Sequence, residues 1–132
     1  MDKSFENGCV FIVGGSGGIG SLCAKEFAQS GARVAITYYK NEQAAIDVAN
    51  DINNDVQIYQ LDNSDPKSVE ETFQKVVNFY GSINTLVNAA GFDIPQKFIS
   101  EIDIDLWRGV IDADINGFFN LVKFGLPHLR KS

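Results

Sequence analysis

Continuous apolar runs alternate along the chain with stretches in which apolar residues recur every three or four positions. The runs predict strands over 9–13, 33–38, 56–61 and 85–88. The periodic stretches predict amphipathic helices over 19–30, 41–52, 66–80 and 103–130. The order β-α-β-α-β-α-β-α is typical of an α/β protein with a parallel sheet.

Capping residues mark several helix ends. Asp65-Pro66 predicts a helix start, because Asp accepts a capping hydrogen bond and Pro suits the first turn. Gly31 and Gly81 predict helix ends, because glycine readily takes the left-handed conformation found there.

Each helix has an apolar face that we expect to contact the sheet. In the first helix this face consists of Ile19, Leu22, Cys23 and Phe27. In the third helix it consists of Val69, Phe73, Val76, Val77 and Tyr80. In the long helix it consists of Leu106, Val110, Phe118 and Val122.

Strands that are apolar along their whole length are buried on both faces, which predicts a doubly wound, Rossmann-like parallel sheet. A doubly wound dinucleotide fold uses two halves, and this pattern supplies only the first. Alone, the fourth strand leaves an apolar edge unpaired. We therefore interpret residues 1–132 as the N-terminal part of a single dinucleotide-binding domain whose C-terminal catalytic half is absent from the chain. A partner that covers this edge is the alternative.

Composition narrows the class of protein. The chain is 45% apolar and 21% charged, as globular proteins are, and its net charge of −6 argues against nucleic-acid binding. No apolar run approaches the about 20 residues that span a bilayer, and the N-terminus does not resemble a signal peptide. Cys9 and Cys23 fit neither a disulfide framework nor a metal site. We expect a cytoplasmic protein without nucleic-acid, membrane or metal partners.

A glycine-rich segment, Gly14–Gly20, lies between the first predicted strand and helix. Glycines permit a tight turn and close approach of the backbone to a pyrophosphate, which then lies at the helix N-terminus. The segment therefore predicts a dinucleotide-binding loop formed by Gly14, Ser16, Gly17, Gly18, Ile19 and Gly20.

Two other chemistries use similar loops. A P-loop needs a lysine before its final Ser or Thr, and Gly20-Ser21 lacks it. The segment also satisfies G-x-S-x-G, the nucleophile turn of serine hydrolases, with Ser16 as nucleophile and His128 as the only histidine. A serine hydrolase is thus an alternative.

Four segments together resemble the classical short-chain dehydrogenases/reductases, most closely the 3-oxoacyl-thioester reductase type. Val13–Gly20 resembles the T-G-x-x-x-G-x-G cofactor loop, and Leu86–Gly91 resembles the N-N-A-G segment. Asp62-Asn63 matches the adenine-contacting Asp, and Ile115-Asn116-Gly117 matches the structural and catalytic Asn. The resemblance implies that Asn116 is catalytic and that the cofactor contacts include Asp62, Asn63, Asn88, Ala89, Ala90 and Gly91. Val13 departs from the family's Thr, and Ala89 from its second Asn.

The resemblance implies an NAD(P)-dependent oxidoreductase that transfers hydride between a nicotinamide and the carbonyl or alcohol carbon of a small molecule. The family's catalytic Ser and Tyr-x-x-x-Lys are missing, since no lysine here has a tyrosine four residues before it. We therefore expect the 132 residues alone to be inactive. A non-catalytic nucleotide-binding module is the alternative.

The end of the second strand bears on the cofactor. NAD enzymes place a carboxylate there for the ribose 2′-hydroxyl, whereas this chain has Tyr38-Tyr39-Lys40. Lys40 suits a 2′-phosphate and Tyr39 suits stacking on adenine. The sequence thus favours NADP(H) over NAD(H).

The resemblance also implies a homodimer or homotetramer formed through the helix over 103–130. Apolar residues occupy more than one face of its second half: Phe118, Phe119, Leu121, Val122, Phe124 and Leu126. A helix apolar nearly all round is buried on two sides. The unpaired edge of the fourth strand is a rival cause of association.

Overall fold

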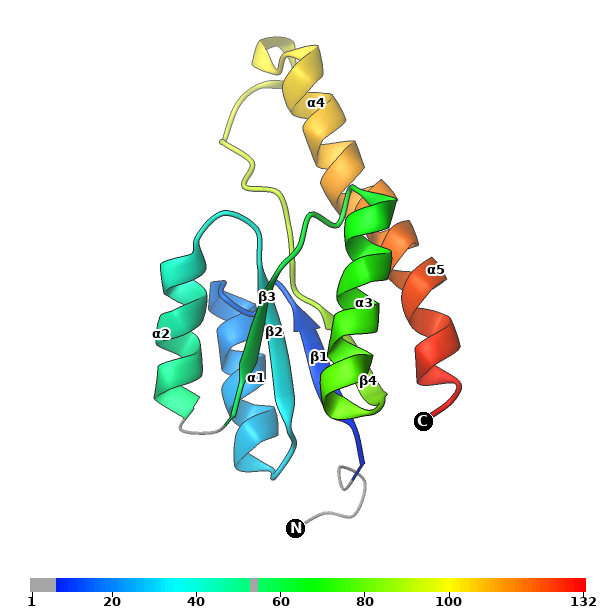
Figure 1. The fold of residues 1–132 in the computed structure, drawn as a ribbon. Coiled ribbons are helices and arrows are strands. Elements are labelled where there is room, and N and C mark those ends of the chain that lie inside the picture. The colour runs from blue at the N-terminus through cyan, green and yellow to red at the C-terminus, as the bar shows by residue number, and fades with distance from the viewer. Residues whose placement is uncertain (1–6, 53–54) are drawn as a thin grey trace.

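The computed structural model describes residues 7–52 and 55–132, which form a parallel sheet with helices on both faces (Figure 1). The strands are β1 (Cys9–Val13), β2 (Val34–Tyr38), β3 (Gln57–Gln60) and β4 (Ile83–Asn88), in the spatial order β3-β2-β1-β4. The helices are α1 (Gly18–Gln29), α2 (Glu42–Ile52), α3 (Pro66–Tyr80), α4 (Ile104–Val110) and α5 (Gly117–Leu129). The predicted Rossmann-like fold is confirmed.

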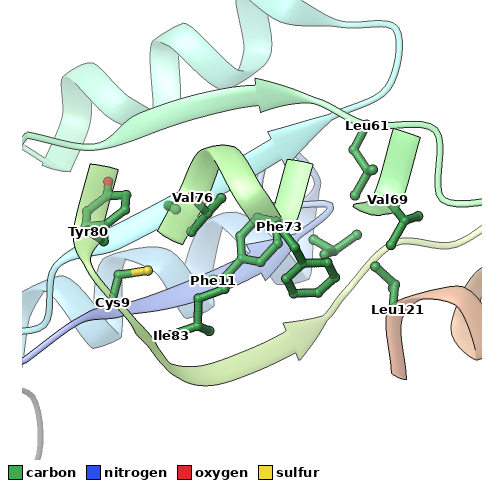
Figure 2. Packing of buried hydrophobic residues seen from close by; sticks show 11 residues of the cluster. Cys9, Phe11, Leu61, Val69, Phe73, Val76, Tyr80, Ile83 and Leu121 are labelled. Carbon is green, nitrogen blue, oxygen red and sulfur yellow. The ribbon is translucent and has the colours of Figure 1, made fainter. Parts of the chain in front are cut away.

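Alternate residues of β1 face opposite sides of the sheet, as the strand period requires. Val10 and Ile12 belong to the buried cluster that includes Ala24 of α1 and Ala45 of α2. The other face packs on α3 and α5, and its buried residues are Cys9, Phe11, Val13, Ala35, Leu61, Val69, Phe73, Val76, Tyr80, Ile83 and Leu121 (Figure 2). β1 is therefore buried along its whole length.

The helix ends agree with the capping signals. The Asp65 carboxylate accepts a hydrogen bond from the Lys67 N–H at 3.1 Å, and Pro66 begins α3. Gly31 and Gly81 have φ of +91° and +89° and follow α1 and α3. Asp103 caps α4 through the Leu106 N–H, at 2.7 Å.

The predicted sheet-facing side of α1 is partly wrong. Ile19 and Leu22 are 75% and 63% exposed, and Gly20 and Ala24 are buried instead. The reason is the short distance between this helix and the loop before it, since a Cβ on Gly20 would overlap the carbonyl oxygen of Gly14. At the start of α1 small residues therefore face inward and Ile19 and Leu22 project outward, whereas the predicted contacts Cys23 and Phe27 do pack against the core cluster.

The long helix differs from the prediction in two ways. A π-helical turn over Ile111–Asn116 separates α4 from α5. The buried side of α5 consists of Gly117, Asn120, Leu121 and Gly125, whereas the predicted contacts Phe118 and Val122 are 55% and 40% exposed. A Cβ on Gly125 would lie 2.7 Å from the Phe73 ring, so glycines bring the α5 backbone close to α3. Hydrophobicity alone does not reveal a face made by glycines.

β4 is an edge strand. It pairs with β1, and among the described residues nothing pairs with its other side. The residues from Asn84 to Val87 are only half-buried, in contrast to β1. The predicted unpaired edge is therefore present in residues 7–52 and 55–132.

The described residues were compared with the features of membrane, metal-binding and disulfide-bonded proteins. None of its helices is long and apolar enough to cross a bilayer. It contains no group of three or more His, Cys, Asp or Glu side chains arranged to hold a metal ion. Cys9 and Cys23 are free thiols, and burial raises the pKa of the Cys9 thiol to about 12.

Candidate functional site

A cleft of about 440 Å³ lies where the strands end. Its lining comes from the ends of all the strands and from the middle of the long helix, and α4 extends beyond this edge of the sheet (Figure 1). The lining residues are Val13, Gly14, Ser16, Gly17, Thr37, Tyr38, Tyr39, Leu61, Asp62, Asn63, Ser64, Ala89, Ala90, Gly91, Phe92, Gly109, Asp112 and Ala113. The carboxyl edge of a parallel sheet is where doubly wound folds bind ligands.

Most of the residues predicted from the sequence meet in this cleft: Gly14, Ser16, Gly17, Tyr38, Tyr39, Asp62, Asn63, Ala89, Ala90 and Gly91. Other predicted residues are not part of its lining: Gly18, Ile19, Gly20, Lys40, Asn88 and Asn116. The structure therefore unites segments that are far apart in the sequence, and it leaves Asn116 outside.

The glycines of the loop serve different purposes. Gly14 has φ of +78°, and a Cβ there would lie 2.6 Å from the backbone nitrogen of Ala90. Packing within the protein thus explains why position 14 is glycine. It also explains why position 20 is glycine, because a Cβ there would overlap the Gly14 carbonyl oxygen. A Cβ on Gly18 would meet no protein atom within 4 Å. The protein interior does not require glycine at 18, whereas a ligand that approaches the backbone would.

Thr37 holds the glycine loop in place. Its hydroxyl oxygen accepts a hydrogen bond from the Gly14 N–H at 3.0 Å, and the residue is only 2% exposed. The Thr37 hydroxyl on β2 thereby ties the glycine loop to the neighbouring strand. Val13 cannot make such a contact, because its side chain has no polar atom. Thr37 was not among the site residues predicted from the sequence, although a hydroxyl in a strand buried on both faces needs a hydrogen-bond partner.

Contacts at the end of β3 orient the Asp62 carboxylate. Its Oδ1 atom accepts hydrogen bonds from the Ser64 N–H at 3.0 Å and from the Ser64 hydroxyl at 2.6 Å. At the end of β2, the Lys40 ammonium lies 5.3 Å from the centre of the Tyr39 ring. Acidic and aromatic side chains thus border the same end of the cleft.

The segment after β4 forms another wall. The Ala89 N–H donates to the Val13 carbonyl at 2.8 Å, and the Asn88 side chain accepts from the Ala90 N–H at 3.2 Å. The Asp114 carboxylate accepts from the Phe92 N–H at 3.1 Å, which ties this segment to the long helix. Asn88 therefore shapes the turn from outside the cleft.

Asn116 is exposed, and its amide donates to the Asp112 carboxylate at 2.8 Å. Asp112 lines the cleft and Asn116 does not, so a catalytic role for Asn116 stays a prediction. The sequence analysis did not find the helix residues that do line the cleft, Gly109, Asp112 and Ala113. These helix residues reach the cleft because the long helix crosses the edge of the sheet at this point. No local sequence pattern specifies the position of that crossing.

The residues of the hydrolase alternative do not come together. Ser16 lines the cleft, whereas the His128 ring stacks on Phe73, with centroids 5.8 Å apart. The cleft lining contains no histidine, and His128 is the only one in the sequence. The geometry of the described residues therefore supplies no histidine base for Ser16.

A parallel sheet whose glycine-rich β1–α1 loop opens on a cleft at the strand ends defines a Rossmann-type dinucleotide-binding fold. The family model described as short chain dehydrogenase matches residues 8–132. The chain therefore belongs to the short-chain dehydrogenase family.

Known relatives include a meso-2,3-butanediol dehydrogenase of Serratia marcescens, 32% identical over 128 residues, which are 97% of this chain and 51% of that protein. An L-fucose dehydrogenase of Mus musculus is 28% identical over 123 residues, 93% of this chain and 44% of that protein. The chain thus spans about half the length of the curated relatives it matches.

Solved structures agree. A short-chain dehydrogenase/reductase from Serratia marcescens superposes with a TM-score of 0.86 at 25% identity, over 96% of this chain and 52% of that one. A 3-ketoacyl-(acyl-carrier-protein) reductase from Brucella melitensis, complexed with NADH, gives a TM-score of 0.89 at 22% identity, over 98% of this chain and 52% of that one. Because its identity is only 22%, the similarity to the Brucella melitensis reductase shows the fold alone.

Replacing Thr37 by Val tests the loop contact. The isosteric side chain leaves the Gly14 N–H without its acceptor, so we expect the free energy of unfolding to fall by about 1–3 kcal/mol. Thr37→Ser, which keeps the hydroxyl, is the control and should lose less. Urea denaturation measures both, and equal losses in the two variants would contradict the role of the hydroxyl.

Proposed function

We propose that this chain is the cofactor-binding part of an NAD(P)-dependent oxidoreductase of the short-chain type. The observation that carries the proposal is the geometry of the glycine loop, in which Gly14, Ser16 and Gly17 line the cleft and a Cβ on the next residue, Gly18, would meet no neighbouring side chain or loop within 4 Å. The named relatives at 28–32% identity, which are dehydrogenases, support it. The substrate is then a small carbonyl compound or alcohol, with 3-oxoacyl thioesters as one candidate class.

The residues present fit a dinucleotide. No side chain caps the N-terminus of α1, so its first-turn N–H groups are oriented to bind a pyrophosphate. Asp62 and Tyr39 both line the cleft, and we infer that Asp62 accepts from the adenine amino group and that Tyr39 stacks on the base. When bound, the cofactor supplies the hydride chemistry, and the protein positions it.

Replacing Gly18 by Val tests the proposed pyrophosphate site. A Cβ at position 18 has open space around it and the valine obstructs ligand approach, so we expect cofactor affinity to fall at least about tenfold with little change in stability. Gly20→Ala is the matched contrast, and its overlap with Gly14 should destabilise the fold by about 1–3 kcal/mol. Calorimetric titration and thermal unfolding measure the two effects, and unchanged affinity in Gly18→Val would refute the assignment.

We propose that the cofactor is NADP(H) rather than NAD(H). Lys40 directly follows Tyr39, a cleft residue, and its ammonium rests over that ring. An ammonium there suits a 2′-phosphate, and neither Tyr38 nor Tyr39 offers a carboxylate to a ribose hydroxyl.

Replacing Lys40 by Glu tests this preference. Loss of a charge-assisted contact should weaken NADP(H) binding at least about tenfold while NAD(H) binding is unchanged or tighter. Lys75→Glu on α3 makes the same charge change at an exposed position outside the cleft and should have no effect. Tighter binding of NAD(H) than of NADP(H) by the unaltered chain would overturn the proposal.

We propose that these 132 residues bind cofactor without turning over substrate. No Tyr-x-x-x-Lys occurs in the sequence, and the cleft lining holds neither a lysine nor a histidine. In the mechanism implied by the family, Asn116 takes part in proton transfer. Here the Asn116 amide donates a hydrogen bond to Asp112, and Asp112 lines the cleft. We further infer a cytoplasmic protein, which its free thiols suit.

We propose that the protein forms a homodimer or homotetramer through the outer side of the long helix. Exposed apolar residues gather there: Ile104, Trp107, Ile115, Phe118, Phe119, Val122 and Leu126. Leu121 and Phe124 belong to the opposite side of the helix, which packs on the core cluster. The outer surface proposed for assembly therefore excludes both.

Changing Phe118 and Phe119 to Asp tests this interface. Charges on an apolar contact surface should dissociate the oligomer, with cofactor affinity retained, because both rings are more than half exposed in the single chain. Phe79→Asp, at an exposed phenylalanine of α3, is the control. Sedimentation velocity measures the assembly, and an intact oligomer in the double variant would leave the edge of β4 as the cause.

A further inference from the structure

The π-helical turn between α4 and α5 has a specific cause. In an α-helix the N–H of Gly117 would donate to the carbonyl of Ala113, but here it donates to the carbonyl of Asp112, five residues back. The Ala113 carbonyl is thereby released, and it accepts a hydrogen bond from the Asn63 side-chain amide at 3.3 Å. A side chain from the end of β3 thus occupies the place of a helical N–H group.

Two further contacts join Asn63 to the helix, one at its side chain and one at its backbone carbonyl. A Cβ on Gly117 would lie 2.7 Å from the Asn63 amide nitrogen, so only glycine leaves room for it. The Asn120 amide donates to the Asn63 carbonyl at 2.9 Å, and Asn120 is only 5% exposed. Asn63, Gly117 and Asn120, here called the helix clamp, hold the loop after β3 against the long helix.

The helix clamp lies beside the cleft. Asn63 and Ala113 both belong to its lining, on the β3 loop and the helix respectively, while Gly117 and Asn120 do not. The hydrogen bond from Asn63 to Ala113 therefore fixes the separation of two walls. Asp112, which accepts a hydrogen bond from Asn116, directly precedes Ala113 and also lines the cleft. π-helical turns often occur at functional sites.

We propose that Asn63 is a positioning residue that maintains the π-helical turn and so holds the helix wall at the distance that the cofactor requires. The identity of the ligand rests on the proposed function, whereas the clamp itself does not. Without the Asn63 amide, the Ala113 carbonyl regains the Gly117 N–H, the turn returns to α-helix, and the residues beyond it rotate relative to the cleft.

A double-mutant cycle tests the clamp without any ligand. Gly117→Ala should lower Tm by about 3–5 °C in the unaltered chain, because the new methyl group collides with the Asn63 amide. In an Asn63→Ala background the collision is gone, and the same substitution should leave Tm unchanged or raise it, since Ala favours helix. The same loss of Tm in both backgrounds would overturn the clamp.

Cofactor affinity tests the positioning role. Asn63→Ala and Gly117→Ala should each weaken NADP(H) binding at least about fivefold at a temperature where both are folded, and the double variant should be no weaker than Asn63→Ala. Gly117 lies outside the cleft, so its effect separates positioning from direct contact. Asn63→Asp, which keeps the size but cannot donate to Ala113, should also weaken binding and is measured as a single variant only, because it retains the collision with the methyl group of Gly117→Ala. Asn63→Ser, which is too short to fill the place of the amide, replaces Asn63→Ala if that variant does not fold.

Asn78→Ala, at an exposed asparagine of α3, is the control and should bind as the unaltered chain does. Wild-type affinity in folded Gly117→Ala would overturn the positioning role. If the unaltered chain binds neither NADP(H) nor NAD(H), the proposed function is wrong. The change in Tm caused by Gly117→Ala in the two backgrounds still shows whether the helix clamp exists.

Discussion

The structure depends on the close approach of two backbone segments at Gly14. With φ of +78° and no side chain, Gly14 lies against the backbone of Ala90, where a Cβ would come within 2.6 Å. The same residue leaves its carbonyl oxygen beside Gly20, which brings α1 down onto the loop. This contact joins the end of β1 to the segment after β4 and forms the floor of the cleft, so any larger residue would separate its walls.

Single polar contacts then tie the remaining walls to this floor. Thr37 links the loop to β2, Asp114 links the segment after β4 to the long helix, and Asn63 links that helix to β3. Each contact pairs a side chain with a backbone group that regular structure leaves without a partner. Because the cleft is bounded by segments from different parts of the chain, its width is a property of these links rather than of any one motif.

Sequence and structure differ most where glycines replace apolar side chains at a helix contact. Hydrophobic periodicity placed Ile19 and Leu22 against the sheet together with Cys23 and Phe27, yet at the start of α1 the buried residues are Gly20 and Ala24, and only Cys23 and Phe27 of the predicted set pack on the core. The same error moved the core face of α5 from Leu121 and Gly125 toward Phe118 and Val122. Periodicity counts apolar side chains, whereas the closest helix contacts are made where side chains are smallest.

The sequence by itself determined the alternation of strands and helices along the chain, several helix ends, the glycine loop and most of the cleft residues that follow the strands. These follow from local causes, namely burial on both faces, capping chemistry and the fixed edge at which parallel strands end. Only the tertiary structure decided the π-helical turn, the partners of Thr37 and Asn63, and the helix residues that close the cleft. Those depend on how closely α5 approaches the sheet, a distance set by packing between residues such as Phe73 and Gly125 that are remote in the sequence.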